Sequence, residues 1–169
     1  MSRTVVASLL KISLANFTLA LIAVGAGAQQ LPTCMNHYDG TQVPIITNQP
    51  SDSPAYSTLD PRTGRPEIFL DLGVLRQYES SQDTLTFIVL HECGHVNLGH
   101  LNVGAVSHKK SNQEELAADC YAAKAVHQMG YTQTDLQRVL FDVDKLPKDP
   151  DHPAGPVRGA NITRCFNGN

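Results

Sequence analysis

Residues 85–98 constrain this chain most, because they combine the apolar periodicity of a buried helix with ionisable side chains. Apolar residues recur at helical spacing after a helix-start cluster at Ser80-Ser81-Gln82-Asp83, and Gly99 or Gly104 ends the segment. Inside it stands His91-Glu92-Cys93-Gly94-His95. A carboxylate on a buried helix is costly unless something compensates its charge. The fold must therefore build a charged centre against this helix.

The spacing of the two histidines points to a metal ion. Four residues turn a helix by about 400°, so His91 and His95 project from one face, roughly 6 Å apart along the axis. Both imidazoles can then reach one Zn²⁺ at about 2.0–2.1 Å. Glu92 lies about 100° further round the helix, where it can reach water without binding the metal. Gly94 costs the helix about 1 kcal/mol, which predicts close approach by another backbone.

Two histidines leave a tetrahedral zinc site one protein ligand short. A third histidine, as in the longer zinc motif, would need glycine at position 98 and histidine at position 101, but the chain has Leu98 and Leu101. The other option is an acidic residue on a following helix.

Glu115-Leu116-Ala117-Ala118-Asp119 supplies such an acid. Glu115 and Asp119 are four residues apart and share a helix face, and the two alanines between them allow close helix packing. We predict that Glu115 binds zinc and that Asp119 accepts the free N–H of a ligating histidine. Glu114 is the rival ligand. We interpret it instead as a solvated acid in the first helical turn, where the helix dipole favours it.

The first 28 residues have the pattern of a secretory signal peptide. Arg3 and Lys11 flank a short basic region, residues 12–24 are mainly apolar, and Ala26-Gly27-Ala28 forms an A-x-A cleavage pattern. The apolar run is shorter than the roughly 18–20 residues that span a bilayer. We therefore expect an exported protein, periplasmic or secreted, with no stable membrane span after cleavage.

Residues 29–169 are expected to form a single domain. Cleavage after residue 28 leaves 141 residues with a formal charge of −5, from 11 basic and 16 acidic side chains. A domain of about this size can bury a substantial core. A mildly acidic chain lacks the basic surface of a nucleic-acid-binding protein, so no nucleic-acid partner is expected.

Two strands are expected to form an antiparallel hairpin. Ala55–Leu59 and residues 67–71 alternate or run apolar, and the residues between them, 60–65, have turn chemistry. Residues 43–47 predict a further short strand, which Pro44 would confine to the edge of a sheet.

Helical periodicity follows the hairpin. A short helix is predicted around Val74, a long one over residues 113–129 and a third over Gln133–Lys145. Residues 147–159 are rich in Pro, Gly and Asp and predict a loop, after which a short tail ends at Cys165. The sequence thus predicts an α+β fold, a small antiparallel sheet or hairpin packed on the active-site helix with two further helices.

Residues 55–165 contain the two metal motifs and two further features. These are His100, five residues beyond His95, and Met129-Gly130-Tyr131. In this combination the chain resembles the gluzincin metallopeptidase family that includes the CAAX prenyl endopeptidases, and more closely its soluble periplasmic quality-control members. The resemblance implies a zincin-like fold, in which the active-site helix packs beneath a small sheet whose edge strand pairs with substrate. His100 is rotated away from the ligand face, so we expect it to support or cap rather than bind metal.

The segment from His152 to Arg158 is similar to the His-Pro-x-x-x-x-Arg segment of that family. The resemblance implies that His152 or Arg158 donates to the developing oxyanion if the last loop folds back over the site. A structural salt bridge for Arg158 and a surface position for His152 are the alternatives. A second gluzincin group, with cytosolic regulator-cleaving roles, also resembles residues 91–100, but it normally has Asn where this chain has Asp119, and a signal peptide does not suit it.

Four cysteines in an exported chain allow three disulfide pairings. Cys34 and Cys165 lie near opposite ends of the mature chain, where a bridge would tie down both termini. Cys93 and Cys120 lie on the two metal helices, where a bridge would lock the helix pair. We expect the pairing 34–165 with 93–120.

These residues lead us to expect a zinc metalloendopeptidase with one Zn²⁺ per chain and Glu92 as general base for metal-activated water. It would act on exported or misfolded proteins, and residues 67–71 would bind the polypeptide substrate as an extended strand. The alternative is a zinc-stabilised, latent or non-catalytic binding or chaperone-like module of the envelope. A purely structural metal site is a third hypothesis, which leaves the acidity of Glu92 unexplained.

Overall fold

The computed structural model describes residues 31–47, 49–51, 53–77, 80–101, 110–145 and 152–168. The expected signal peptide lies outside these ranges. Within them the chain forms five short strands and five helices, in the order β1 (Cys34–Met35), β2 (Gln42–Val43), β3 (Ile45–Ile46), β4 (Ala55–Leu59), β5 (Pro66–Leu70), α1 (Leu72–Gln77), α2 (Gln82–Asn97), α3 (Asn112–Gln128), α4 (Gln133–Lys145) and α5 (Gly155–Phe166). The expected α+β class is confirmed.

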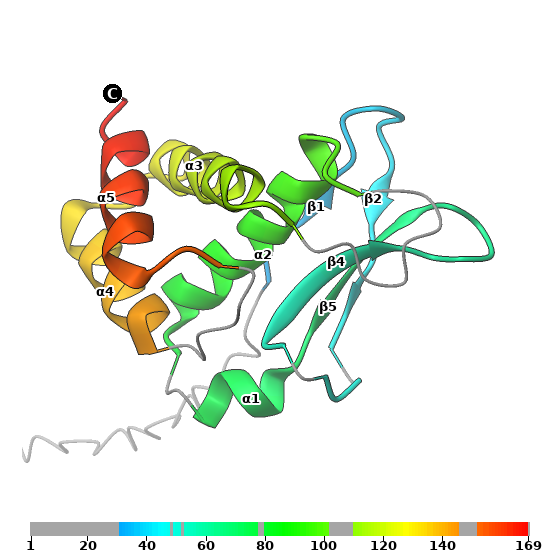
Figure 1. Cartoon of the computed structure of the whole chain (residues 1–169), viewed down its shortest axis with the longest axis horizontal. Coiled ribbons are helices and arrows are strands. Elements are labelled where there is room, and N and C mark those ends of the chain that lie inside the picture. Colours follow the sequence, from blue (N-terminus) through cyan, green and yellow to red (C-terminus); the bar gives the residue numbers. More distant parts are fainter. Residues whose placement is uncertain are drawn as a thin grey trace, which may run out of the picture.

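Helix α2 runs through the middle of the molecule, between the sheets on one side and α4 and α5 on the other, and α3 lies across it (Figure 1). One apolar cluster joins α2 to the strands, through residues such as Ile68, Leu70 and Val89. A second cluster joins α2 to α3, α4 and α5, through residues such as Phe87 and Val126. Since α2 is buried on nearly every side, its ionisable residues are enclosed by protein.

The ends of α2 follow the sequence prediction. Ser81 is the N-cap and its hydroxyl accepts a hydrogen bond from the Thr84 N–H. Asp142 of α4 accepts two further hydrogen bonds there, from the Ser81 N–H at 2.9 Å and the Thr84 hydroxyl at 2.8 Å. At the other end Gly99 adopts φ +73°, so the first of the two candidate glycines ends the helix.

The main sheet has the strand order β3-β5-β4. β4 and β5 pair in antiparallel register, with Ala55 opposite Leu70 and Ser57 opposite Ile68, which confirms the expected hairpin. The expected strand over residues 43–47 is divided at Pro44 into β2, which pairs with β1, and β3, which pairs in parallel with β5. As predicted, the segment around Pro44 lies at an edge of the sheet. Because β3 is parallel to β5 while β4 is antiparallel to it, the sheet is mixed, and the expectation of a purely antiparallel sheet is wrong.

The expectation that residues 67–71 present a free edge to substrate is wrong. β5 is the central strand, because β3 pairs with one of its sides and β4 with the other. The edge strands are β3 and β4, and among the described residues no strand covers the outer edge of either. With five residues β4 is the longer of the two. At the two ends of β4, Pro54 O accepts from Asp71 N–H, and Asp60 N–H donates to Arg65 O. The backbone hydrogen-bonding groups of residues 54 and 60 therefore point toward the β5 side. Because hydrogen-bonded pairs alternate along an antiparallel ladder, the backbone of Ser57 points to the outer edge.

The predicted close approach at Gly94 is confirmed. A Cβ at this position would lie 3.1 Å from Tyr121 Cβ, 3.2 Å from Ala118 Cα and 3.3 Å from Ala118 O. Glycine on α2 and alanine on α3 therefore bring the two helix backbones together.

The expected loop and tail at the carboxyl end are instead a fifth helix. α5 begins at Gly155, has Pro in its first turn and runs to Phe166, which covers the second half of the predicted loop. Its buried face consists of Asn161, Ile162, Cys165 and Phe166, spaced three and four residues apart. That periodicity is present in the sequence, but the Pro and Gly residues before it obscured the helix start.

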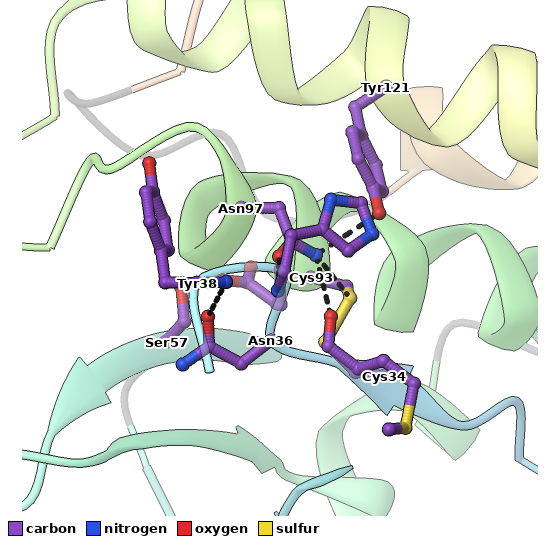
Figure 2. Close-up of a disulfide and its surroundings, with 10 residues drawn as sticks. Cys34, Asn36, Tyr38, Ser57, Cys93, Asn97 and Tyr121 are labelled. Atoms are coloured by element: carbon purple, nitrogen blue, oxygen red, sulfur yellow. Dashed lines mark hydrogen bonds between the residues drawn. A yellow bond between two sulfur atoms is a disulfide. The ribbon is translucent and has the colours of Figure 1, made fainter. Parts of the chain in front are cut away.

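The expected disulfide pairing is also wrong. All four cysteines are bridged, but Cys34 pairs with Cys93 and Cys120 pairs with Cys165. Gly94 faces α3, and its neighbour Cys93 is rotated about 100° further round α2, where it meets β1 (Figure 2). The side chain of Cys120 likewise points away from α2 and toward α5, where it bonds to Cys165. The two bridges therefore attach β1 and α5 to the helix pair rather than joining the pair itself.

Asn97, at the end of α2, extends the link to the β1 region. Its side-chain amide donates to Met35 O at 3.0 Å, to Cys93 Sγ at 3.4 Å and to the Tyr121 hydroxyl at 3.1 Å, and its carbonyl accepts from His37 N at 2.8 Å (Figure 2). Among the described helices, none has both the length and the apolarity that a membrane crossing requires.

The two bridges can be tested by mapping and by removal. Peptide mapping of the unreduced protein should recover linked peptides that contain Cys34 with Cys93 and Cys120 with Cys165. Replacing Cys120 and Cys165 together by alanine should lower the free energy of unfolding by about 2–4 kcal/mol, because the unfolded chain loses a cross-link. Urea denaturation measures this loss. A linked peptide containing Cys93 and Cys120 would contradict the described fold.

Two helical glycines should respond oppositely to alanine. Gly94→Ala should lower the free energy of unfolding by about 1–2 kcal/mol, because overpacking against the Ala118 backbone outweighs the gain in helix propensity. Gly159 of α5 is the control, since its added Cβ would meet only Leu140 Cδ2, at 3.9 Å. Gly159→Ala should be neutral or stabilise by up to about 1 kcal/mol. A Gly94→Ala variant as stable as the native chain would refute the close packing.

Candidate metal centre

The structure brings His91, His95 and Glu115 together into one buried group that could hold a metal ion. The distance between His91 Nε2 and His95 Nε2 is 3.1 Å. Glu115 Oε2 lies 3.2 Å from His91 Nε2, and Glu115 Oε1 lies 3.4 Å from His95 Nε2. The candidate ligands from two different helices are therefore in place.

The spacing of these atoms fits a small cation. Ligands about 2.0–2.1 Å from a tetrahedral zinc ion lie about 3.3–3.4 Å from one another. The three separations, 3.1, 3.2 and 3.4 Å, lie at that value or slightly below it. Two imidazole nitrogens and a carboxylate oxygen are also donors that zinc accepts. The residues present thus fit one divalent ion.

Asp119 fixes the orientation of His91. Its Oδ1 lies 2.9 Å from His91 Nδ1. A carboxylate can only accept, so Nδ1 carries a proton and Nε2 is the ring nitrogen that faces Glu115 and His95. Sequence analysis predicted such a contact with a ligating histidine.

Arg158 holds Asp119 in turn. Its Nε donates to Asp119 Oδ2 at 2.9 Å and its Nη2 donates to Oδ1 at 2.7 Å, a two-pronged pair between α5 and α3. Burial would raise the pKa of Asp119, but Arg158 and His91 outweigh it and lower that pKa to about 2. The contacts of Arg158 match the salt-bridge alternative, and its expected catalytic role stays a prediction.

His100 supports the second histidine. Its Nδ1 lies 2.9 Å from His95 Nδ1, so it contacts the nitrogen of His95 that faces away from Glu115. This agrees with the expected supporting role. Burial lowers the pKa of His95 to about 4, which keeps that imidazole in the neutral form that binds metals.

The electrostatics of the centre favour a positive charge. Burial alone would lower the pKa of His91, but Asp119 and Glu115 raise it to about 9. Burial would raise the pKa of Glu115, yet its contacts with His152, His91 and His95 lower it. Two carboxylates that converge on the same imidazole create a place where a cation is stabilised.

His152, which lies shortly before α5, reaches the centre. His152 Nε2 lies 3.0 Å from Glu115 Oε2, and its ring centroid is 6.0 Å from that of His91. Its side chain is 27% exposed, whereas that of Glu115 is 2% exposed. His152 therefore stands between the buried group and solvent, although its catalytic role stays a prediction.

Glu114, the rival ligand, is used elsewhere. Its carboxylate accepts the Ser111 N–H at 2.7 Å, while Ser111 Oγ accepts the Glu114 N–H at 3.2 Å. This reciprocal capping box begins α3, so Glu114 is an acid of the first helical turn, as we interpreted it.

Glu92 is buried and has two partners that sequence analysis missed. Ser57 Oγ donates to Glu92 Oε2 at 2.8 Å, and Lys110 Nζ lies 3.8 Å from the same oxygen. Burial would raise the pKa of Glu92, but Lys110 and both histidines outweigh it and lower that pKa. Ser57 had a signal, since it is a polar residue on the inward face of an alternating strand. No pattern in the sequence marked Lys110.

A pocket opens beside Glu92. Its apolar lining comes from Ala55 of β4, Phe87 and Ile88 of α2, Val143 of α4 and Pro153 before α5. The ionisable residues of the lining are His91, Glu92, Asp144, His152 and Arg158, so the pocket is largely apolar and includes one candidate ligand and the buried glutamate.

Fold and site together define a class: an α+β protein with a buried group of two histidines and one glutamate that can hold one metal ion. The family model for Peptidase U49 matches residues 54–167, about two thirds of the chain. The chain therefore belongs to the Peptidase U49 family, which indicates that it is a peptidase. No curated protein and no solved structure matches it.

Metal binding should depend on Glu115 and not on its neighbour. Zinc at about 100 times its dissociation constant should raise the free energy of unfolding of the native chain by about 2.7 kcal/mol. Glu115→Gln should largely abolish this gain, because it removes a charged ligand. Glu114→Gln is the matched control and should keep the gain, since glutamine also serves in a capping box. Thermal unfolding with and without zinc measures both. Equal zinc stabilisation of the two variants would contradict the assigned ligand.

Proposed function

We propose that this peptidase is a zinc-dependent endopeptidase of the gluzincin type. The observation that carries the proposal is the convergence of His91 Nε2, His95 Nε2 and the Glu115 carboxylate, with the buried carboxylate of Glu92 one residue from the first ligand. Because the chain belongs to a peptidase family, we infer that this arrangement serves the hydrolysis of peptide bonds. Zinc, when bound, would supply a Lewis acid that lowers the pKa of water.

Glu92 is the general base in this proposal. Its pKa is lowered, so the carboxylate is ionised at neutral pH and can take a proton from the attacking water. The water oxygen adds to the peptide carbonyl carbon. When the C–N bond breaks, Glu92 returns that proton to the leaving amine nitrogen, which completes the proton balance.

His152 is our candidate donor to the oxyanion that forms on the peptide carbonyl. Its imidazole lies beside Glu115 and is partly open to solvent, where a substrate would arrive. Arg158 serves differently in this proposal, because its guanidinium holds Asp119. We infer that Arg158 acts by orienting His91 through that carboxylate.

A polypeptide would bind as an extended strand along the outer edge of β4. The Ser57 side chain contacts Glu92 while its backbone points outward, and Ala55, two residues along the same strand, lines the apolar pocket. A paired peptide would carry its backbone past Glu92 and turn alternate side chains toward the pocket. This replaces the earlier expectation for residues 67–71.

Exported or misfolded proteins are the proposed substrates. Two disulfides are compatible with an exported protein, since such bridges persist in oxidising compartments. An unfolded chain offers the extended backbone that β4 needs.

A latent or binding module remains the second candidate. It is favoured by the enclosure of the centre, because His91, Glu92, His95 and Glu115 are each 4% exposed or less and His152 stands over them. In that case the chain would hold zinc and bind polypeptides without cleaving them.

The test compares the native chain with Glu92→Gln. The variant should keep about one zinc per chain, because Glu92 is not a ligand. Its cleavage of casein or of a reduced, unfolded protein should fall by about 10²–10⁴-fold, the contribution of a general base. Metal analysis and peptide release measure the two quantities.

Glu114→Gln is the control for loss of one carboxylate and should cleave as the native chain does. Zinc bound by the native chain with no cleavage of several unfolded substrates would favour the binding module. Full activity of Glu92→Gln would overturn the assignment of the base.

A further inference from the structure

A hydroxyl donor and an ammonium group from different parts of the fold lie against one oxygen of Glu92, and the ammonium group also donates to the hydroxyl oxygen. Ser57 Oγ donates to Oε2 at 2.8 Å, and Lys110 Nζ lies 3.8 Å from Oε2 and 3.4 Å from Ser57 Oγ. The side chains of Lys110 and Glu92 are 12% and 6% exposed, so the contacts are shielded from solvent. Ser57 belongs to β4, and Lys110 directly precedes the N-cap of α3.

A glutamate side chain has three rotatable bonds, so a base on α2 needs external contacts to keep one orientation. Among the described residues, Ser57 and Lys110 both contact Oε2. We assign Oε1 as the oxygen that takes the proton. A carboxylate held by one oxygen can present the other without reorganising during the reaction.

Ser57 also links the base to substrate. Its side chain contacts Glu92, while its backbone points to the outer edge of β4, where a peptide strand would pair. One residue therefore contacts both the bound peptide backbone and the group that removes the proton. This sets the register of the scissile bond relative to Glu92.

We propose that Ser57 and Lys110 are positioning residues that hold Glu92 in its reactive orientation and align it with a peptide on β4. The inference rests on the proposed function, because it assigns Glu92 as the base. It concerns residues outside both metal motifs.

The test begins with two truncations. Ser57→Ala and Lys110→Met should each lower kcat by about tenfold, the usual worth of a hydrogen bond to a charged group. KM and zinc affinity should stay within about twofold, because neither residue binds metal and the strand backbone is kept. Steady-state cleavage and a zinc competition titration give these values.

Conservative variants separate positioning from packing. Ser57→Thr keeps the hydroxyl and Lys110→Arg keeps the charge, so both should recover most of the lost kcat. Ser51→Ala is the matched control, because Ser51 Oγ donates to Ser53 O before β4 and Ser51 is not part of the pocket wall. It should leave kcat unchanged.

The decisive comparison uses the Glu92→Gln background. Ser57→Ala should cost no further activity there, because the group that it orients has already lost its function. An equal loss in both backgrounds would overturn the proposal, as would a kcat within twofold of native or a rise in KM alone.

A stability cycle tests the contact without activity. Ser57→Ala, Glu92→Ala and the double variant should have non-additive changes in unfolding free energy, because the two side chains touch. If the native chain cleaves nothing while the cycle is non-additive, the proposed function fails and the contact stands. If the native chain cleaves and the changes are additive, this inference fails alone.

Discussion

The close packing of α2 on α3 is the contact on which the candidate metal centre depends. At Gly94 the two backbones approach so closely that a Cβ would lie 3.2 Å from Ala118 Cα. This closeness brings Glu115 and Asp119 within reach of His91 on the facing helix. A larger side chain at either small residue would separate carboxylate from imidazole. Gly94 and Ala118, the small residues inside the two motifs, are therefore as necessary to the metal centre as the ligands.

Charge explains why other elements gather around this helix pair. Glu92, Glu115 and Asp119 are three buried carboxylates, and buried charge requires partners. Arg158 arrives from α5 and Lys110 from the start of α3, and a divalent ion between His91, His95 and Glu115 would add the remaining positive charge. The bridge between Cys120 and Cys165 attaches α5 to α3, which also keeps Arg158 close to Asp119.

Features that lie within one element could be predicted from the sequence. The bounds of β4 and α4, the cap of α2 at Ser81 and the function of Gly94 all follow from local propensity and periodicity. The three candidate ligands, His91, His95 and Glu115, were also predicted. In each metal motif the two key residues, either the two histidines or Glu115 and Asp119, are four apart on one helix. The spacing fixes their common face before any tertiary contact is known.

Features that depend on which elements meet could not be predicted in the same way. The sequence placed Cys93 and Cys120 on neighbouring helices, but only their rotation about those helices decides that each turns to a different partner. Likewise, the hairpin of β4 and β5 was predicted. The pairing of β3 with β5, which closes the second edge of β5 and leaves that of β4 open, was not. The contacts of Glu92 also depend on which elements meet. Ser57 and Lys110 are far from it in sequence, and they meet its carboxylate only when strand order and helix packing are both in place. The common helix face of each motif pair is thus encoded locally, while the orientation of the proposed base is a property of the whole fold.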